Sequence, residues 1–427
     1  MAFMKLSRAL FLLSFIVAGI APVRGATTTF PDVNDLPVQT NLPDVMIMDD
    51  GTRVTTPQQW QQRREEVKAI LEHYELGHAP PPPGNVKGKD VQSESLLDGA
   101  VKYRLVHLSF GPHRKLGLDI AIFTPAAKGP FPTIINPSFF MTPGANFTNG
   151  IAPPVPATTN RLLRMFSMPV DPARAAMMFS NQLARGYAIV TYRYTQCGED
   201  NPNFRTNTFY PAYPGYDWGV LMGWAWGLSR IVDYLETQPF VDKDKIIVLG
   251  HSRLGKLTMV ATAFDDRISL GAPAGSSGAG TGAYRFCGPG RGGNEGVEDM
   301  TRKYGYYFVP GLKDFTGQMD KLPFDAYWYV ALTAPRPWIS IEGTVDQNCV
   351  PNAVKQTLLA AQPIYQFLGV STNRVAANYE PHRHMLTADD WNAALDFADQ
   401  QLRGIDHQRT FDNFPDDDAS TNSVTAQ

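Results

Sequence analysis

The sequence contains little cysteine, little net charge and, after its first residues, no long apolar run. Its 427 residues include three cysteines, and none of them stands in a Cys-x-x-Cys pair of the kind that binds zinc. A net charge of −3 excludes strong electrostatic attraction to nucleic acid or to an anionic membrane. No segment beyond the N-terminus is apolar enough to predict a transmembrane helix. We therefore expect no nucleic acid or membrane partner and no metal.

The cysteines leave two interpretations open. Cys197, Cys287 and Cys349 allow one disulfide and one free thiol in an oxidising compartment. Three buried free thiols are the alternative, and the spacing does not decide between them.

The first 25 residues predict a secretory signal peptide. Lys5 and Arg8 form a basic start, an apolar run covers residues 9–21, and the small residues Val23 and Gly25 stand at the −3 and −1 positions of a cleavage site. The run is shorter than the ~20 residues that a membrane span needs. We expect a mature chain that is secreted or periplasmic.

The rest of the composition is typical of a globular enzyme, with 43% hydrophobic and 19% charged residues. Residues 56–77 predict an amphipathic helix, because their apolar side chains fall on one helical face. Thr56 suits the N-cap of this helix and Pro57 its first position. A proline run follows it as a connector. We interpret this helix as an N-terminal extension of a single domain over 26–404, followed by a disordered tail over 405–427.

Strand-like and helical segments alternate after residue 85, which indicates an α/β fold with a mostly parallel sheet covered by helices on both faces. Segments 101–110 and 116–126 predict an antiparallel pair. The segments that predict central strands, rich in Val, Ile and aromatic residues, are 131–140, 186–194, 245–252 and 335–344. The predicted helices among them are 217–238, 253–264 and a capped helix at 387–404.

Residues 246–256, "IIVLGHSRLGK", predict a strand, a tight turn at Ser252 and a helix. This is the local structure that exposes the nucleophile of α/β-hydrolases. Gly250 and Gly255 are small enough for a sharp turn and close packing of strand on helix. The segment lacks the spacing of a phosphate-binding loop.

A serine nucleophile needs a histidine base and an acid that orients it, and in α/β-hydrolases these follow in the order Ser, Asp/Glu, His. His384 stands just before the last predicted helix, where this architecture has its base. His382 is the competitor, whereas His407 lies in or near the polar tail. Asp346 follows the penultimate strand and is the preferred acid. Glu342, nearer the strand end, is the alternative.

Arg253 follows the serine directly. Its backbone N–H suits an oxyanion hole, and its side chain adds a cation that suits an oxyanion or an anionic sugar acid. A salt bridge to a loop carboxylate is the other interpretation of this side chain.

The elbow "GHSRLGK" resembles the G-C/H-S-R-x-G-K motif of carbohydrate esterase family 15, the glucuronoyl methylesterases. Segments 50–86, 322–346 and 384–402 also resemble the bacterial members. The resemblance covers residues 40–404 and implies an α/β-hydrolase fold, a three-layer sandwich, without a cofactor.

By position, the resemblance implies that Ser252 is the nucleophile, His384 the base and Arg253 the oxyanion stabiliser. It implies sugar contacts for Lys256 and for Glu295. Two features depart from the fungal members. Ser276 stands where they have a catalytic Glu, which favours the acid after the penultimate strand, and no sugar-stacking Trp follows that strand. Trp328, Tyr306 and Tyr307 are candidate replacements.

The resemblance implies a serine esterase that hydrolyses esters of (4-O-methyl-)glucuronate on glucuronoxylan or lignin–carbohydrate complexes through an acyl-enzyme. We expect it to be a monomer. An esterase for acetyl-xylan or another small ester is the first alternative, since it differs only in the acyl pocket. A non-catalytic carbohydrate-binding relative is the second, because the acid of the fungal members is missing.

Overall fold

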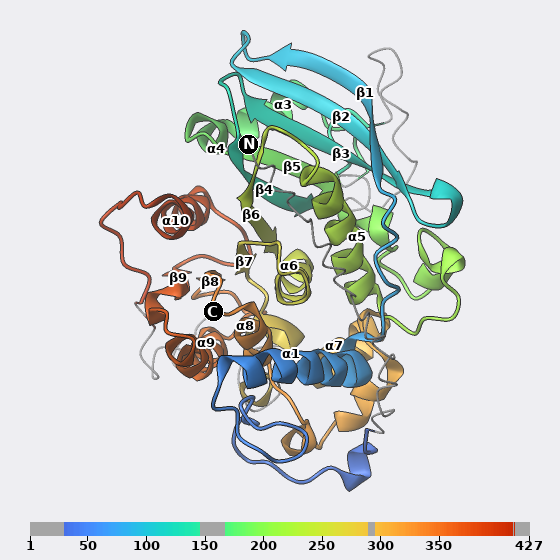
Figure 1. The fold of residues 1–427 in the computed structure, drawn as a ribbon, viewed down its shortest axis with the longest axis vertical. Helices are drawn as coiled ribbons and strands as arrows, with labels where there is room; N and C mark the ends of the chain where they lie inside the picture. Colours follow the sequence, from blue (N-terminus) through green and yellow to red (C-terminus); the bar gives the residue numbers. More distant parts are fainter. Residues whose placement is uncertain (1–29, 146–166, 289–294, 413, 415–427) are drawn as a thin grey trace, which may run out of the picture.

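The computed structural model describes residues 30–145, 167–288, 295–412 and 414, so the predicted signal peptide lies outside the described residues. Within them, the strands form one sheet in the order β1-β2-β3-β5-β4-β6-β7-β8-β9 (Figure 1). The strands are β1 (Lys87–Leu96), β2 (Val101–Phe110), β3 (Leu116–Pro125), β4 (Phe131–Ser138), β5 (Ala188–Arg193), β6 (Val241–His251), β7 (Leu270–Ala274), β8 (Trp338–Gly343) and β9 (Val375–Glu380).

The sheet is antiparallel at one end and parallel through the rest. β1, β2 and β3 pair antiparallel, β3 pairs antiparallel with β5, and the strands from β5 to β9 are parallel. The predicted antiparallel pair is confirmed, with Val101 of β2 opposite Pro125 of β3. Because parallel strands share a direction, the loops after β4 to β9 meet at one edge of the sheet, where open α/β sheets bind ligands.

Helices cover both faces, which confirms the predicted α/β-hydrolase architecture. One hydrophobic cluster joins the sheet to α1, α5, α6, α8 and α9, and a second joins its other face to α3, α4 and α10 (Figure 1). The helices are α1 (Pro57–Leu71), α3 (Pro172–Met178), α4 (Ser180–Ala184), α5 (Val220–Leu235), α6 (Arg253–Phe264), α7 (Val297–Tyr304), α8 (Tyr327–Thr333), α9 (Pro351–Phe367) and α10 (Ala388–Ala398).

Two helix starts follow directly from the sequence. Thr56 and Gln59 form a capping box at α1, and Thr387 and Asp390 form another at α10. The N-terminal helix packs onto the domain, since Arg64 donates to the carbonyl oxygen of Leu332 in α8 over 3.1 Å. The helical extension therefore shares the core of the domain.

The first residues of the predicted tail contact the domain. Phe411 is 8% exposed and its ring packs against Phe397, with centroids 5.2 Å apart. Its carbonyl oxygen accepts a hydrogen bond from the backbone N–H of Ala377 in β9. Residue 413 and residues 415–427 lie outside the described part, so the predicted disorder of the tail is untested there.

Two further expectations concern cysteines and membranes. Cys197, Cys287 and Cys349 are all buried and none of the three forms a disulfide, so the interpretation with three thiols is the one observed. Among the described residues, no helix has both the length and the hydropathy required to span a bilayer.

Candidate active site

Ser252 lies at a strained turn between β6 and α6. Its φ of 61° and ψ of −129° are unusual for a residue with a side chain, and such strain costs on the order of 1–3 kcal/mol. Its backbone N–H donates to the carbonyl oxygen of Ala274 over 2.8 Å, and its own carbonyl oxygen accepts from Gly255 over 2.8 Å. These bonds to β7 and α6 hold the turn and expose the hydroxyl.

Two glycines make this turn possible. A Cβ on Gly250 would lie 2.3 Å from the carbonyl oxygen of Leu254, and a Cβ on Gly255 would lie 1.9 Å from Oγ of Ser276. The hydroxyl of Ser276 is within hydrogen-bond distance of the carbonyl oxygens of Ser252, 2.6 Å, and Ala274, 2.8 Å. Ser276 therefore stabilises the turn, and Gly255 leaves room for its side chain.

His384 joins Ser252 to Asp346. Its Nε2 lies 2.8 Å from Oγ of Ser252, and its Nδ1 lies 2.6 Å from Oδ2 of Asp346. A carboxylate only accepts hydrogen bonds, so Nδ1 carries the proton and Nε2 is free to accept the serine proton. Burial opposes the charge of Asp346, but hydrogen bonds from His384 and from the backbone N–H of Asn348 hold its pKa below the usual value.

The alternative residues have other partners. Glu342 is completely buried; its Oε1 lies 3.4 Å from Oγ1 of Thr281, and burial together with the nearby Asp346 raises its pKa to about 8. His382 pairs with Asp390 over 3.0 Å and His407 with Asp399 over 2.9 Å. Of the candidates weighed from the sequence, Asp346 is the acid that contacts His384, and His384 is the histidine that contacts Ser252.

The ring of His251 packs against the ring of His384, with centroids 4.5 Å apart. Burial, and then the proximity of His384, lowers the pKa of His251 to about 4, so this ring is neutral near neutral pH.

The side chain of Arg253 forms the salt bridge considered as its second interpretation. Its guanidinium pairs with Asp200, which also accepts hydrogen bonds from Tyr194, Tyr306 and Tyr307, at 2.6, 2.8 and 3.1 Å. Burial opposes the charged form of Arg253, but the nearby Tyr307 and Asp200 hold its pKa above the usual value. The same side chain lines the cavity that Ser252 opens into, so the salt bridge and a role in the site are compatible.

The cavity over Ser252 has a volume of about 860 Å³ and is rich in polar groups. Its lining brings together residues from the segments that follow five strands, β5, β6, β7, β8 and β9: Glu199, Asp200, Ser252, Arg253, Glu295, Asn348 and His384. Because these strands are parallel, the segments that follow them all begin at the same edge of the sheet. Residues distant in the sequence therefore lie close together there.

Lys256 and Glu295 both line a small extension of this cavity, about 40 Å³, that Ser252 and His384 also line. Lys256 is 4% exposed, and its Nζ donates to the carbonyl oxygen of Ser276 over 3.2 Å. Burial lowers its pKa, although Glu295 opposes the shift. The two residues assigned to sugar contacts therefore lie beside the serine.

The candidate aromatic replacements divide between the site and the core. Trp328 is 2% exposed, and its indole N–H donates to the carbonyl oxygen of Pro43, away from the cavity. Tyr307 lines the small extension, and Tyr306 bonds to Asp200.

Sequence reasoning missed Asp200, Tyr304 and Asn348, all of which line the main cavity. Asp200 and Asn348 had a usable signal, because they follow the carboxyl ends of β5 and β8. Tyr304, at the end of α7, had none.

Among the described residues, the ligand atoms of Asp346, Cys349 and His384 lie within 4.8 Å of one another. Two of these residues are already engaged in the hydrogen-bonded chain with Ser252. The arrangement thus fits proton transfer, with a serine hydroxyl, an oriented imidazole and a buried carboxylate in line.

Known proteins resemble the chain over most of its length. The model of the family described as "Glucuronyl esterase, fungi" matches residues 165–369. A curated carbohydrate esterase of an unknown prokaryotic organism is 29% identical, over 85% of this chain and 90% of its own. A 4-O-methyl-glucuronoyl methylesterase of Phanerochaete carnosa is 28% identical, over 86% and 82%. A solved structure of a promiscuous family 15 carbohydrate esterase from a marine bacterial metagenome has a TM-score of 0.73 and 28% identity, covering 87% of this chain and 99% of that one.

Proposed function

The chain belongs to carbohydrate esterase family 15 and is a carboxylic ester hydrolase, and we propose that it hydrolyses esters of (4-O-methyl-)glucuronate on glucuronoxylan or lignin–carbohydrate complexes. The observation that carries the proposal is the hydrogen-bonded chain of Ser252, His384 and Asp346 beside a buried Lys256 and Glu295. The relative from Phanerochaete carnosa is named a 4-O-methyl-glucuronoyl methylesterase, which supports the same acid half.

The reaction proceeds in two steps through an acyl-enzyme. Nε2 of His384 takes the proton of Ser252 as Oγ bonds to the ester carbonyl carbon, and then gives that proton to the departing alcohol. In the second step, His384 takes a proton from water as the water oxygen bonds to the acyl carbon. The bond to Oγ of Ser252 then breaks, His384 returns the proton to Ser252, and the acid is released. Asp346 keeps His384 in the required tautomer and stabilises the imidazolium that forms.

The charge that develops on the carbonyl oxygen needs donors within reach. Arg253 begins α6, so its backbone N–H lies at a helix N-terminus, where donors are not used by the helix itself. Its guanidinium adds a cation in the same cavity. We assign the stabilisation of the oxyanion to the backbone N–H and the guanidinium of Arg253.

Lys256 and Glu295 supply the specificity for the acid half. A buried ammonium and a carboxylate that line the same small cavity suit the hydroxyl groups of a sugar ring, which both donate and accept hydrogen bonds. An acetyl group has no hydroxyl for either residue. A buried polar group left without a partner by the wrong substrate penalises that substrate strongly.

The test compares kcat/KM for benzyl glucuronate and benzyl acetate, with Ser252→Ala as the control. We expect the glucuronate ester to be preferred by at least about tenfold and the Ser252→Ala variant to be folded but inactive. Preference for the acetate would favour the small-ester alternative. Absence of turnover together with absence of labelling by a fluorophosphonate would favour the non-catalytic carbohydrate-binding alternative.

We further propose that the enzyme is exported and acts as a monomer. The basic start, the apolar run and the small residues of the first 25 positions support export. Fractionation of cells that express the full chain, followed by N-terminal sequencing of the mature protein, tests the compartment and the cleavage after Gly25. Light scattering of that protein tests the oligomeric state.

A further inference from the structure

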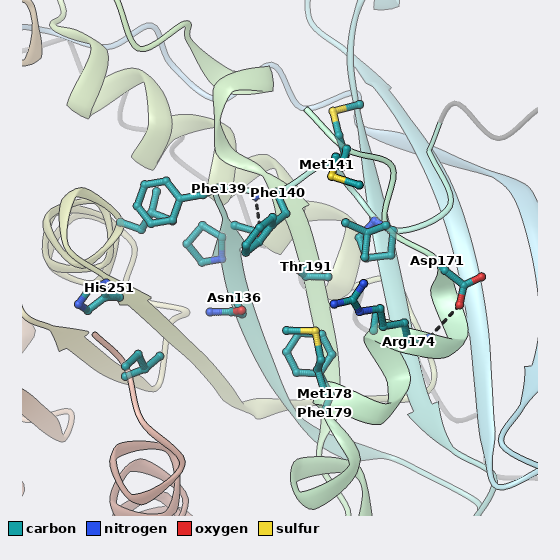
Figure 2. Close-up of a pocket in the computed structure, with 18 of the residues that line it drawn as sticks. Asn136, Phe139, Phe140, Met141, Asp171, Arg174, Met178, Phe179, Thr191 and His251 are labelled. Atoms are coloured by element: carbon teal, nitrogen blue, oxygen red, sulfur yellow. Dashed lines mark hydrogen bonds between the residues drawn. The ribbon is translucent and has the colours of Figure 1, made fainter. Parts of the chain in front are cut away.

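His384 lies on an irregular segment, residues 381–387, between β9 and α10. His384 lines the cavity over Ser252, and Leu386 lines a second, mostly apolar cavity of about 620 Å³. Figure 2 shows the side chains around this second cavity, with His251 at one end of the group. Because residues of the segment line two cavities, protein packs against it on fewer sides than against a strand or helix of the core. Its position therefore depends more on individual bonds.

One buried carboxylate contacts this segment on both sides of His384. Asp390, in the first turn of α10, has a side chain that is completely buried. The backbone N–H and the hydroxyl of Thr387, three residues after His384, each donate to its Oδ2 over 2.8 Å. Nε2 of His382, two residues before His384, lies 3.0 Å from the same oxygen. The carboxylate of Asp390 therefore joins the two ends of the loop that carries the base.

Both ring nitrogens of His382 face groups that can only accept a hydrogen bond. Nδ1 lies 2.7 Å from the carbonyl oxygen of Arg383, and Nε2 faces the carboxylate of Asp390. A neutral imidazole has one N–H, so both contacts are hydrogen bonds only when the ring carries two protons. The pair is then an imidazolium and a carboxylate, and the buried charge of Asp390 is compensated. Charge-assisted hydrogen bonds of this kind are stronger than neutral ones.

The surroundings of His382 favour this charged form. Burial opposes the charge, but the hydrogen bond to the carbonyl oxygen of Arg383 and the negative Asp390 raise the pKa of His382 above its usual value. Asp346, in the loop after β8, acts in the same direction.

Two further titratable groups lie on the strands around His382. His251, at the end of β6, is neutral near neutral pH because its pKa is lowered to about 4. Glu380, the last residue of β9, pairs with Arg409 over 3.6 Å. Asp390 is the carboxylate in direct contact with the ring of His382.

We propose that Asp390 and doubly protonated His382 are positioning residues that hold the base His384 in contact with Ser252. The inference rests on the proposed role of His384, and both residues act through the loop that carries it. When His382 loses its second proton, one of its two hydrogen bonds is lost, and the loop is held less firmly on that side. Since the pKa of His382 is raised, the loss occurs as the pH rises through this folded value, above the ordinary one for histidine.

The test compares the wild type with His382→Gln, whose neutral amide can donate to Asp390 at any pH. Two rates are measured from about pH 5 to about pH 9: kcat for benzyl glucuronate, and the labelling of Ser252 by a fluorophosphonate. At its optimum the wild type should be faster in both by about tenfold, the lower end for a hydrogen bond from a charged group. The difference should disappear as the pH rises and His382 loses its proton. KM should stay the same, because His382 acts on the base and does not bind substrate.

His407→Gln is the matched control. His407 pairs with the buried Asp399 over 2.9 Å, so it is the same kind of pair at the other end of α10. This variant should match the wild type in kcat at every pH. Asp390→Asn should lower kcat by a factor similar to that of His382→Gln, whereas Asp389→Asn, at the exposed neighbouring position, should not. Urea denaturation of each variant checks that the fold is intact.

The other outcomes are decisive. Equal rates for the wild type and His382→Gln at every pH would overturn the proposal, as would a loss that is constant with pH. Profiles with equal maxima, displaced only in the pH at which activity begins, would mean that His382 acts on His384 through its charge alone, which also contradicts a positioning role. If the wild type is neither labelled nor active, the proposed function fails and this inference fails with it. If it is labelled but does not hydrolyse the glucuronate ester, the proposed substrate is wrong, and the labelling rates decide the role of His382.

Discussion

Arg253 and Asp200, 53 positions apart in the sequence, form an ion pair at the edge of the cavity over Ser252. Asp200 also accepts hydrogen bonds from Tyr194, Tyr306 and Tyr307. Charge-assisted bonds of this kind are stronger than neutral ones and fix direction. We infer that the carboxylate is a positioning residue, which holds the guanidinium at the site before substrate arrives.

Loss of either partner of this ion pair should reduce kcat by different amounts. Arg253→Ala removes a cation from the oxyanion, and we expect kcat to fall by about 10²-fold or more. Asp200→Asn keeps Arg253 but loosens its orientation, so the loss should be smaller. The double variant should be no slower than Arg253→Ala alone, because Asp200 acts through Arg253.

The control for this cycle is Glu199→Gln. Glu199 lines the same cavity and carries the same charge, but its carboxylate accepts a hydrogen bond from Asn201 instead. Its kcat should remain near that of the wild type. Additive losses in the double variant would show that Asp200 acts independently of Arg253, and a change confined to KM would mean that Arg253 binds only the ground state.

The two carboxylates after β8 should differ sharply in their effect on rate. Asp346→Asn keeps the shape of the acid but favours the wrong tautomer of His384, so we expect kcat to fall by roughly 10³–10⁴-fold. Glu342→Gln should change kcat by only a few-fold at pH 6.5, because the raised pKa of Glu342 already makes it neutral there. The reverse ranking in steady-state kinetics would move the acid to Glu342.

Glu342 should also make stability depend on pH. Burial, and then Asp346, raises its pKa from 4.5 to about 8. In the unfolded chain this residue loses its proton near its ordinary pKa, whereas the folded protein retains it. Its contribution to the free energy of unfolding is thus fully present below the unfolded pKa and is lost as the pH rises through the folded pKa.

Glu342→Gln removes this dependence. The free energy of unfolding of the variant minus that of the wild type should therefore be larger at pH 8 than at pH 5. Urea denaturation of both proteins at both pH values measures this difference. Burial also raises the pKa of Glu75, to about 7, but Glu75 is present in both proteins and cancels in the comparison. A difference between variant and wild type that is constant with pH would mean that Glu342 is ionised in the fold.

The fold could be predicted where local sequence and tertiary context agree. The alternation of strands and helices predicted the parallel sheet, and Thr56 and Thr387 predicted two helix starts that the structure confirms. The segment of β7, "LGAPA", has no β-branched residue, and its strand conformation comes from pairing with β6 and β8 on either side. β1 is almost entirely exposed and polar, so no hydrophobic period marks it.

The candidate site could be predicted only for the residues that a sequence motif or the order of the triad along the chain identifies. Ser252, Asp346 and His384 were selected by the elbow and the order of the triad, and they are in hydrogen-bond contact; their catalytic roles stay predictions. The network around Asp200 joins the loop after β5, the start of α6 and the segment that follows α7, and contacts between segments so far apart leave no local pattern. The apolar cavity beside His251 is similarly a product of tertiary packing.

Lys256 allows a test that separates a binding role from a structural one. Its ammonium is buried, burial lowers its pKa, and it lies in the small extension beside Ser252. Lys256→Met has a similar length and no charge, so we expect the free energy of unfolding to be unchanged or increased. A hydrogen bond from a charged group contributes about 1.5–3 kcal/mol, so kcat/KM for a glucuronate ester should fall by roughly 10–100-fold.

An acetyl ester supplies the internal control for Lys256→Met, because it offers no hydroxyl to the ammonium. Its kcat/KM should stay near the wild-type value, and urea denaturation should show an intact fold. If both esters lose activity in parallel and the free energy of unfolding falls, Lys256 supports the elbow through its bond to the carbonyl oxygen of Ser276 instead of binding the sugar. If Lys256 binds the sugar, the variant should lose activity on the glucuronate ester alone and keep its fold, because only that ester has hydroxyl groups for the ammonium to bind.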